Sequence, residues 1–268
     1  MRKNAWVICC CTAVLAAFGT FFRWLQDQVC FEAETGLAVR GSIWPYAVAL
    51  MIVIAAVVLA VVCFRMKNQP HTSFPDSLPA AFAAAQRVRT IGGIVLGALL
   101  AVGGAWLMIS TGTLSSPGLQ RVLAVLAIVT GAAFARQMLA PSDAEATSGA
   151  VVCASMPIVL LAFWLIVSYK VNIINPTISA YAVEILALCA ALIAFYQLAG
   201  FAYGRPKAIK SIFWSQFAAF LCITALPDDR AGGQQLMLAA IAGILVFQSY
   251  LTASNIRPAV SGPVGGAQ

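Results

Sequence analysis

Long apolar runs separated by short polar stretches cover most of the chain. A helix needs about 20 mostly apolar residues to cross the hydrocarbon core, and about 17 can suffice. Eight runs approach or reach that length, and they are expected to be transmembrane helices: residues 5–22, 44–64, 90–110, 121–139, 150–169, 181–203, 211–226 and 236–253. The pattern predicts an all-α integral membrane helical bundle of about eight transmembrane helices, with residues 1–268 forming a single domain.

The seventh run, "SIFWSQFAAFLCITAL", is the weakest of the eight because it is short and contains Ser215 and Gln216. Without it the count falls to seven, and the C-terminus lies on the other side of the membrane.

Composition supports the membrane interpretation. Hydrophobic residues make up 62% of the 268 residues and charged residues 9%, whereas soluble proteins average about 25% charged residues. A soluble domain of this length would need a polar surface that the chain cannot supply. The lipid bilayer is therefore the expected partner of most of the protein's surface.

The 16 basic residues predict an orientation. With the N-terminus in the cytoplasm, eleven of them fall on the cytoplasmic side: Arg2, Lys3, Arg65, Lys67, Arg87, Arg89, Arg136, Arg205, Lys207, Lys210 and Arg257. Five fall outside: Arg23, Arg40, Arg121, Lys170 and Arg230. This distribution follows the positive-inside rule, so we expect a multi-pass protein of the cell membrane with both termini in the cytoplasm. No nucleic-acid partner is expected, because no soluble face gathers these residues beside aromatic ones.

Small residues at four-residue spacing predict close helix packing. The third run contains Gly93, Gly97 and Ala101 at this spacing, and the fourth contains Gly131 between two alanines. Such stripes let helix backbones approach each other in lipid. We expect these two helices to be neighbours in a compact bundle, while a protein partner or a homo-oligomer is left open.

Glu184 is the acidic residue that lies inside an apolar run, one turn from the expected outer end of the sixth. Ionisable groups within membrane spans are costly and often functional. With Lys170 as its nearest expected cation, and Arg121 next, Glu184 is the candidate proton or cation site. The alternative is an interfacial carboxylate close to the water boundary.

Other polar features allow two interpretations each. Pro157 interrupts the fifth run, as either a static kink or a break that lines a binding site. Asp27, Glu32 and Glu34 lie in the expected outer loop 23–43, which is either solvated or able to hold a hard cation. The matching letters "YAVAL" and "YAVEI" near the starts of the second and sixth runs indicate either two parallel four-span halves or a chance match between alanine-rich spans.

Catalytic chemistry is not indicated. The chain has one histidine, His71, no carboxylate pair within the spans, and eight cysteines in no zinc-type spacing. Seven cysteines lie in apolar runs, and Cys30 is expected in the outer loop. We therefore expect no enzyme, no metal site and no cofactor.

The stretches "RWLQDQVCFEAETGL" and "FYQLAGFAYGRPK" resemble uncharacterised bacterial polytopic membrane proteins of about this length. The resemblance implies a similar arrangement of about eight spans and no particular activity. Glu184, Pro157 and the internal match favour a small transporter or permease component. The scarcity of polar groups within the spans favours the alternative, a non-transporting accessory or sensory subunit of another complex.

Overall fold

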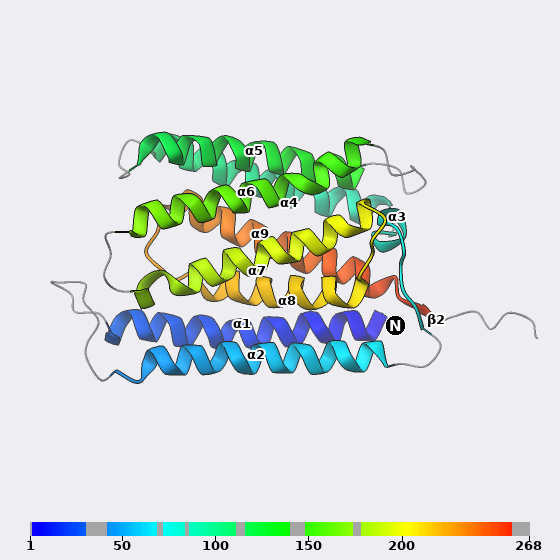
Figure 1. Cartoon of the computed structure of the whole chain (residues 1–268), viewed down its shortest axis with the longest axis horizontal. Helices are drawn as coiled ribbons and strands as arrows, with labels where there is room; N and C mark the ends of the chain where they lie inside the picture. The colour runs from blue at the N-terminus through cyan, green and yellow to red at the C-terminus, as the bar shows by residue number, and fades with distance from the viewer. Residues whose placement is uncertain are drawn as a thin grey trace, which may run out of the picture.

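In the computed structural model, residues 2–30, 42–68, 72–83, 86–110, 116–139, 148–173 and 178–258 are described. Over these residues, long helices run alternately in opposite directions along one common axis (Figure 1). The elements are α1 Arg2–Cys30, α2 Trp44–Lys67, β1 Thr72–Ser73, α3 Leu78–Ala81, α4 Gln86–Ser110, α5 Pro117–Leu139, α6 Ser148–Asn172, α7 Ile178–Ala202, α8 Ala208–Thr224, α9 Gly232–Ser254 and β2 Arg257–Pro258. The prediction of an all-α membrane bundle is confirmed, with one two-residue antiparallel pairing of β1 and β2 added to it.

The helices are long and apolar enough for a membrane protein. Within the described ranges, seven of them could cross a bilayer by length and composition, and α8 is a shorter apolar helix. Large apolar side chains point away from the bundle on its outer helices; Phe18, for example, is 56% exposed and Ile109 is 86% exposed. Contiguous apolar surface of this kind belongs in lipid, so the chain is an integral membrane protein.

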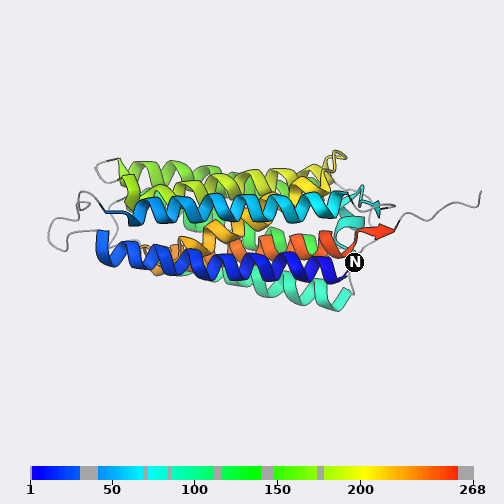
Figure 2. The same cartoon turned by 90° about the horizontal axis from the view of Figure 1, so that it is seen from below.

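The two ends of the bundle differ in character. One end holds the start of α1 and the end of α2, where Arg65 and Lys67 lie, together with the α7–α8 connection that carries Arg205 and Lys207. We call this the basic end. The other end holds the end of α1 and the start of α9 (Figures 1 and 2), and we call it the pocket end.

Helix α8 lies inside the bundle, packed against α1, α2, α7 and α9. Its 17 residues span about 25 Å at 1.5 Å per residue, somewhat less than the hydrocarbon thickness of about 30 Å. Because other helices surround it, α8 can be short and can carry polar residues without exposing them to lipid. The Gln216 Nε2 group donates a hydrogen bond to Ser249 Oγ of α9 at 3.0 Å. The central position of α8 therefore explains why the seventh run is short and contains polar residues.

Helices α4 and α5 approach each other closely through small residues. A Cβ atom added at Gly97 would lie 2.5 Å from the carbonyl oxygen of Gly131, and one added at Gly131 would meet the Gly97 carbonyl oxygen. Ala101 lies beside Gly131, and Gly93 faces Met138. The stripe of small residues noted in the sequence lies at this contact.

Helix α1 is longer than the sequence analysis expected. It continues past Phe22 to Cys30, so Arg23 and Asp27 belong to a helix and not to a loop. Cys30 is buried at the helix end, with its Sγ atom 2.8 Å from Ser42 Oγ. The expected loop residues Glu32, Glu34 and Arg40, and also His71, lie outside the described residues.

The packing does not follow a repeat of two parallel four-helix halves. In such a repeat, α1, α2, α4 and α5 correspond in order to α6, α7, α8 and α9. Because α8 packs against α1 and α2, its counterpart α4 would be expected to pack against α6 and α7. Instead, α4 packs mainly against α5 and α9. The matched letters at the starts of α2 and α7 therefore do not correspond to equivalent places in the bundle.

Candidate functional site

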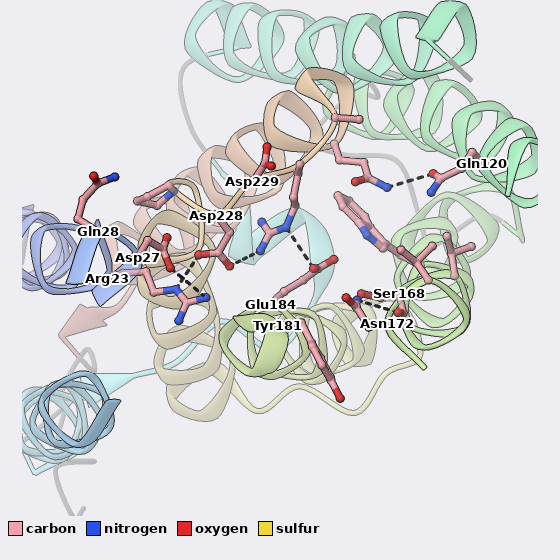
Figure 3. Close-up of a pocket in the computed structure, with 17 residues that line it drawn as sticks. Arg23, Asp27, Gln28, Gln120, Ser168, Asn172, Tyr181, Glu184, Asp228 and Asp229 are labelled. Carbon is pink, nitrogen blue, oxygen red and sulfur yellow. Dashed lines mark hydrogen bonds and ion pairs between the residues drawn. The ribbon is translucent and has the colours of Figure 1, made fainter. Parts of the chain in front are cut away.

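A cavity of about 590 Å³ opens at the pocket end of the bundle. The ends of α1 and α6, the starts of α5, α7 and α9, and the connection between α8 and α9 surround it (Figure 3). Polar and charged side chains from these elements point toward one another across it, with Arg23 on one side and Ser168 and Asn172 on the other. The cavity is thus built from segments that are far apart in the sequence.

Asp228 stands at the centre of a buried network of charges. Its Oδ1 atom accepts a hydrogen bond from Arg23 Nε at 2.6 Å, and its Oδ2 atom accepts one from Arg230 Nη2 at 2.5 Å. Arg230 Nε also donates to Glu184 Oε2 at 3.1 Å. The Arg23 side chain is 1% exposed, and those of Glu184, Asp228 and Arg230 are 9%, 7% and 6% exposed. Four ionisable groups from three parts of the chain therefore form one continuous chain of ion pairs, which we call the charge network.

The connection after α8 holds Asp228 in place. Leu226 N donates to Ile223 O at 3.1 Å and Asp228 N donates to Ala225 O at 3.4 Å, so the chain turns tightly at the helix end. Arg230 Nη1 returns to Ala225 O at 2.9 Å. These bonds fix the carboxylate of Asp228 between the two guanidinium groups.

Both guanidinium groups are occupied by protein acceptors. All three nitrogen atoms of Arg230 donate hydrogen bonds, to Glu184, Asp228 and the Ala225 carbonyl group. Arg23 Nη1 donates to Gln26 Oε1 at 3.0 Å, and Arg23 Nη2 lies 3.9 Å from Asp27 Oδ1. Because their N–H groups already donate to protein acceptors, the two arginines are not expected to bind an external anion.

Two polar groups on the wall of the cavity have no hydrogen-bond partner among the described residues. Trp164 and Ser168 of α6 are 1% and 4% exposed, and neither Trp164 Nε1 nor Ser168 Oγ makes a hydrogen bond. Trp164 lies eight residues before the end of α6, a depth of about 12 Å at 1.5 Å per residue. A buried polar group without a partner is costly, so these groups are expected to bond to water or a solute in the cavity.

The charges that line the cavity do not balance. Four carboxylates, Asp27, Glu184, Asp228 and Asp229, line it together with two guanidinium groups, Arg23 and Arg230, so the lining carries two formal negative charges in excess. Gln120 and Gln234 bond to each other at 3.0 Å and add neutral polar surface. The cavity therefore offers excess negative charge together with an indole N–H group and a hydroxyl group.

The structure gives Glu184 a different partner from the one expected. Glu184 pairs with Arg230, which lies on the connection that brings it directly over α7, whereas Lys170 is exposed at the end of α6 and does not line the cavity. Arg121 is exposed as well. Sequence reasoning thus found Glu184 and missed Arg23, Asp228 and Arg230, although the Arg23 and Asp27 spacing of four residues was a visible helical signal.

The surroundings of Pro157 are closely packed. Pro157 lies inside the continuous helix α6, next to a cavity of about 10 Å³ that apolar side chains such as Leu160 and Phe195 line together with Thr130. This space is too small for a solute. The packing stripe of Gly93, Gly97, Ala101 and Gly131 also lies apart from the cavity at the pocket end.

Among the described residues, no three histidine, cysteine or acidic side chains are grouped so that they could hold a metal ion. In the comparisons with known proteins, no protein-family model matches the chain, and no curated protein or solved structure matches it significantly.

Proposed function

We propose that the protein is a transporter of a small organic cation and that the cavity at the pocket end is its solute site. The observation that carries this proposal is the excess of carboxylates over guanidinium groups in the lining of the cavity, which is large enough for a small solute. Because the guanidinium groups are already paired, a solute with an ammonium group has the carboxylate oxygens as partners. Trp164 Nε1 and Ser168 Oγ would bond to a hydroxyl or carbonyl group of the same solute.

Polar groups along α8 and α9 support a route beyond the cavity. The buried atoms Ser211 Oγ, Ser215 Oγ, Gln216 Oε1 and Gln248 Oε1 have no hydrogen-bond partner in the part of the chain that the structure describes. Water molecules are the usual partners of such groups. These atoms lie from the middle of α8 toward the basic end, and buried apolar residues such as Phe220 and Leu221 separate them from the cavity. A hydrated path here would connect the cavity with the opposite side when the helices shift.

The experiment uses a matched pair of solutes with purified protein in liposomes. Choline and 3,3-dimethyl-1-butanol have nearly the same shape, and only choline carries a positive charge. We expect choline, or another amine in a panel with methylammonium and putrescine, to be taken up, while the neutral alcohol is not recognised. Glu184→Gln should weaken apparent affinity at least tenfold, because it removes one carboxylate from the site.

Lys170→Gln is the matched control, since Lys170 lies at the same end of the bundle but does not line the cavity. Its uptake should equal that of the unchanged protein. Recognition of the neutral alcohol as well as choline, or an unchanged affinity in a folded Glu184→Gln variant, would contradict the proposal.

A second function, an accessory or sensory subunit of another complex, is favoured by one observation. The space beside Pro157 in the middle of α6 is about 10 Å³ and largely apolar, so no solute path passes there. A subunit of this kind would bind the cation without transporting it. Equilibrium binding of choline without uptake into liposomes would support this second function.

The proposal keeps the expectation that the protein is not an enzyme. It also keeps the cell membrane as the location and the cytoplasm as the side of both termini. The supporting observation is the position of Arg65, Lys67, Arg205, Lys207 and Lys210 at the basic end.

A further inference from the structure

A second groove lies at the basic end, away from the charge network. It has a volume of about 520 Å³ and runs between α6 and α7 to the connection that leads into α8. Its lining changes along its length, with Ile158 and Tyr196 toward the middle of the helices and Arg205 and Lys207 at the mouth. The groove is therefore amphiphilic, with an apolar part at membrane depth and a cationic part at the helix ends.

The turn after α7 places the cations at the mouth. Gly204 has φ of +69°, a backbone conformation that favours glycine, and Arg205 N donates a hydrogen bond to Gly200 O at 2.8 Å. A Cβ atom at Gly200 would lie 2.9 Å from Arg205 O, so a small residue is required where the turn folds back over the helix. The backbone of Arg205 is thereby fixed beside the last turn of α7.

The cations at the mouth lack carboxylate partners among the described residues. Arg205, Lys207 and Lys210 are exposed within six residues of one another, and no ion pair between described residues involves them. A cluster of like charges of this kind attracts an anion at the membrane surface. A phosphodiester group at the mouth would have two cations facing it from one connection.

The rest of the groove fits an acyl chain. Tyr196 and Tyr203 are seven residues apart, about 10 Å along one face of α7, and are 65% and 57% exposed. Tyr203 Oη lies 3.0 Å from Ser155 Oγ of α6 and marks the boundary between the polar and apolar parts. Beyond it, Ile158, Tyr196 and Ala199 provide a mainly apolar wall that also includes Gln197. Tyrosine rings are typical of the membrane interface, where one end is polar and the other contacts hydrocarbon.

We propose that this groove binds an anionic glycerophospholipid, with its phosphate group at Arg205 and Lys207 and one acyl chain along Ile158 and Tyr196. A lipid fits better than a free phosphate because the apolar wall continues for about two helical turns below the cations. The proposal does not depend on the function of the cavity at the pocket end.

The test measures lipid retention by native mass spectrometry of the full chain in mild detergent, with phosphatidylglycerol or phosphatidylcholine added. We expect stoichiometric phosphatidylglycerol and at least fivefold less phosphatidylcholine. Arg205→Ala combined with Lys207→Ala should lower phosphatidylglycerol retention at least fivefold. The matched control, Arg65→Ala combined with Lys67→Ala, removes two cations from the same end outside the groove and should have no effect.

Ser155→Phe distinguishes binding in the groove from general attraction to the positive charge of the basic end. The larger side chain fills the groove, while every cation stays in place. It should also reduce phosphatidylglycerol retention, and thermal unfolding checks that each variant is folded. Equal loss in both double variants, or no loss with Ser155→Phe, would overturn the proposal. Displacement of the lipid by glycerol phosphate at equal concentration would overturn it in favour of a small phosphate site.

Discussion

Asp228 is the residue on which the charge network depends, because its two carboxylate oxygens pair with two different arginines. Arg23 reaches it from α1 and Arg230 from the connection before α9. Ion pairs buried in this way contribute little net stability over a well-packed apolar cluster, but breaking one leaves a buried charge without compensation. A substitution that removes one partner of the network is therefore expected to destabilise the protein.

We expect Asp228→Asn to lower the free energy of unfolding by about 3 kcal/mol, because Arg23, 1% exposed, then faces a neutral amide. Chemical denaturation in detergent measures the change. Asp229→Asn is the control, since Asp229 is exposed and next in sequence, and its effect should stay within about 0.5 kcal/mol. Similar losses in the two variants would show that the buried network does not contribute as described.

The sequence indicated part of this site. Glu184 was identified because a carboxylate inside an apolar run is unusual, and it does lie in the network. Its partner was not identified, because Arg230 approaches through the folding of the connection, 46 residues away in sequence. The apolar run ends at Phe22, so the sequence pattern predicts a loop for Arg23 and Asp27. The helix continues to Cys30 since its polar side faces the cavity and needs no lipid-facing apolar residues there.

At the scale of elements, the central position of α8 explains the ambiguity of the seventh run. Hydropathy identifies helices that face lipid, and α8 is enclosed by four other helices. A sequence shows how apolar a run is but not whether other helices surround it. The α4–α5 contact is the opposite case, because glycine and alanine at four-residue spacing lie directly at the interface, as Gly97 and Gly131 do.

We expect Gly97→Leu to lower the free energy of unfolding by about 2 kcal/mol or more, because the side chain would collide with the backbone of Gly131. Gly118→Leu makes the same change near the start of α5, where a Cβ atom has open space, and should have little effect. Thermal unfolding of both variants in one detergent gives the comparison. A stable Gly97→Leu variant would mean that α4 and α5 are not in close contact.

At the scale of the whole molecule, the two ends differ in how much of their positive charge is paired with carboxylates. Arg65, Lys67, Arg205, Lys207 and Lys210 at the basic end are exposed, whereas Arg23 and Arg230 at the pocket end are paired with Asp228 and Glu184. The difference in free positive charge is therefore larger than the count along the sequence indicates. This favours the basic end on the cytoplasmic side.

Cysteine labelling in intact cells tests this orientation. A membrane-impermeant maleimide should label Asp229→Cys from outside and should reach Lys207→Cys only after the membrane is opened. The unchanged protein gives the background from its natural cysteines. Labelling of Lys207→Cys in intact cells would place the basic end outside and reverse the topology.

The ion pair between Arg23 and Asp228 also sets an order of events during biosynthesis. The two residues are 205 positions apart, and the ribosome makes the chain from its N-terminus. Arg23 therefore reaches the membrane long before its aspartate partner exists, with Gln26 and Asp27 of its own helix as the nearest polar groups. Its final burial must wait for α8 and the connection that follows it. The pair thus connects the first helix to the segment between the last two, and it forms late in synthesis. A nascent chain that stops before α8 lacks Asp228 and leaves Arg23 without this partner.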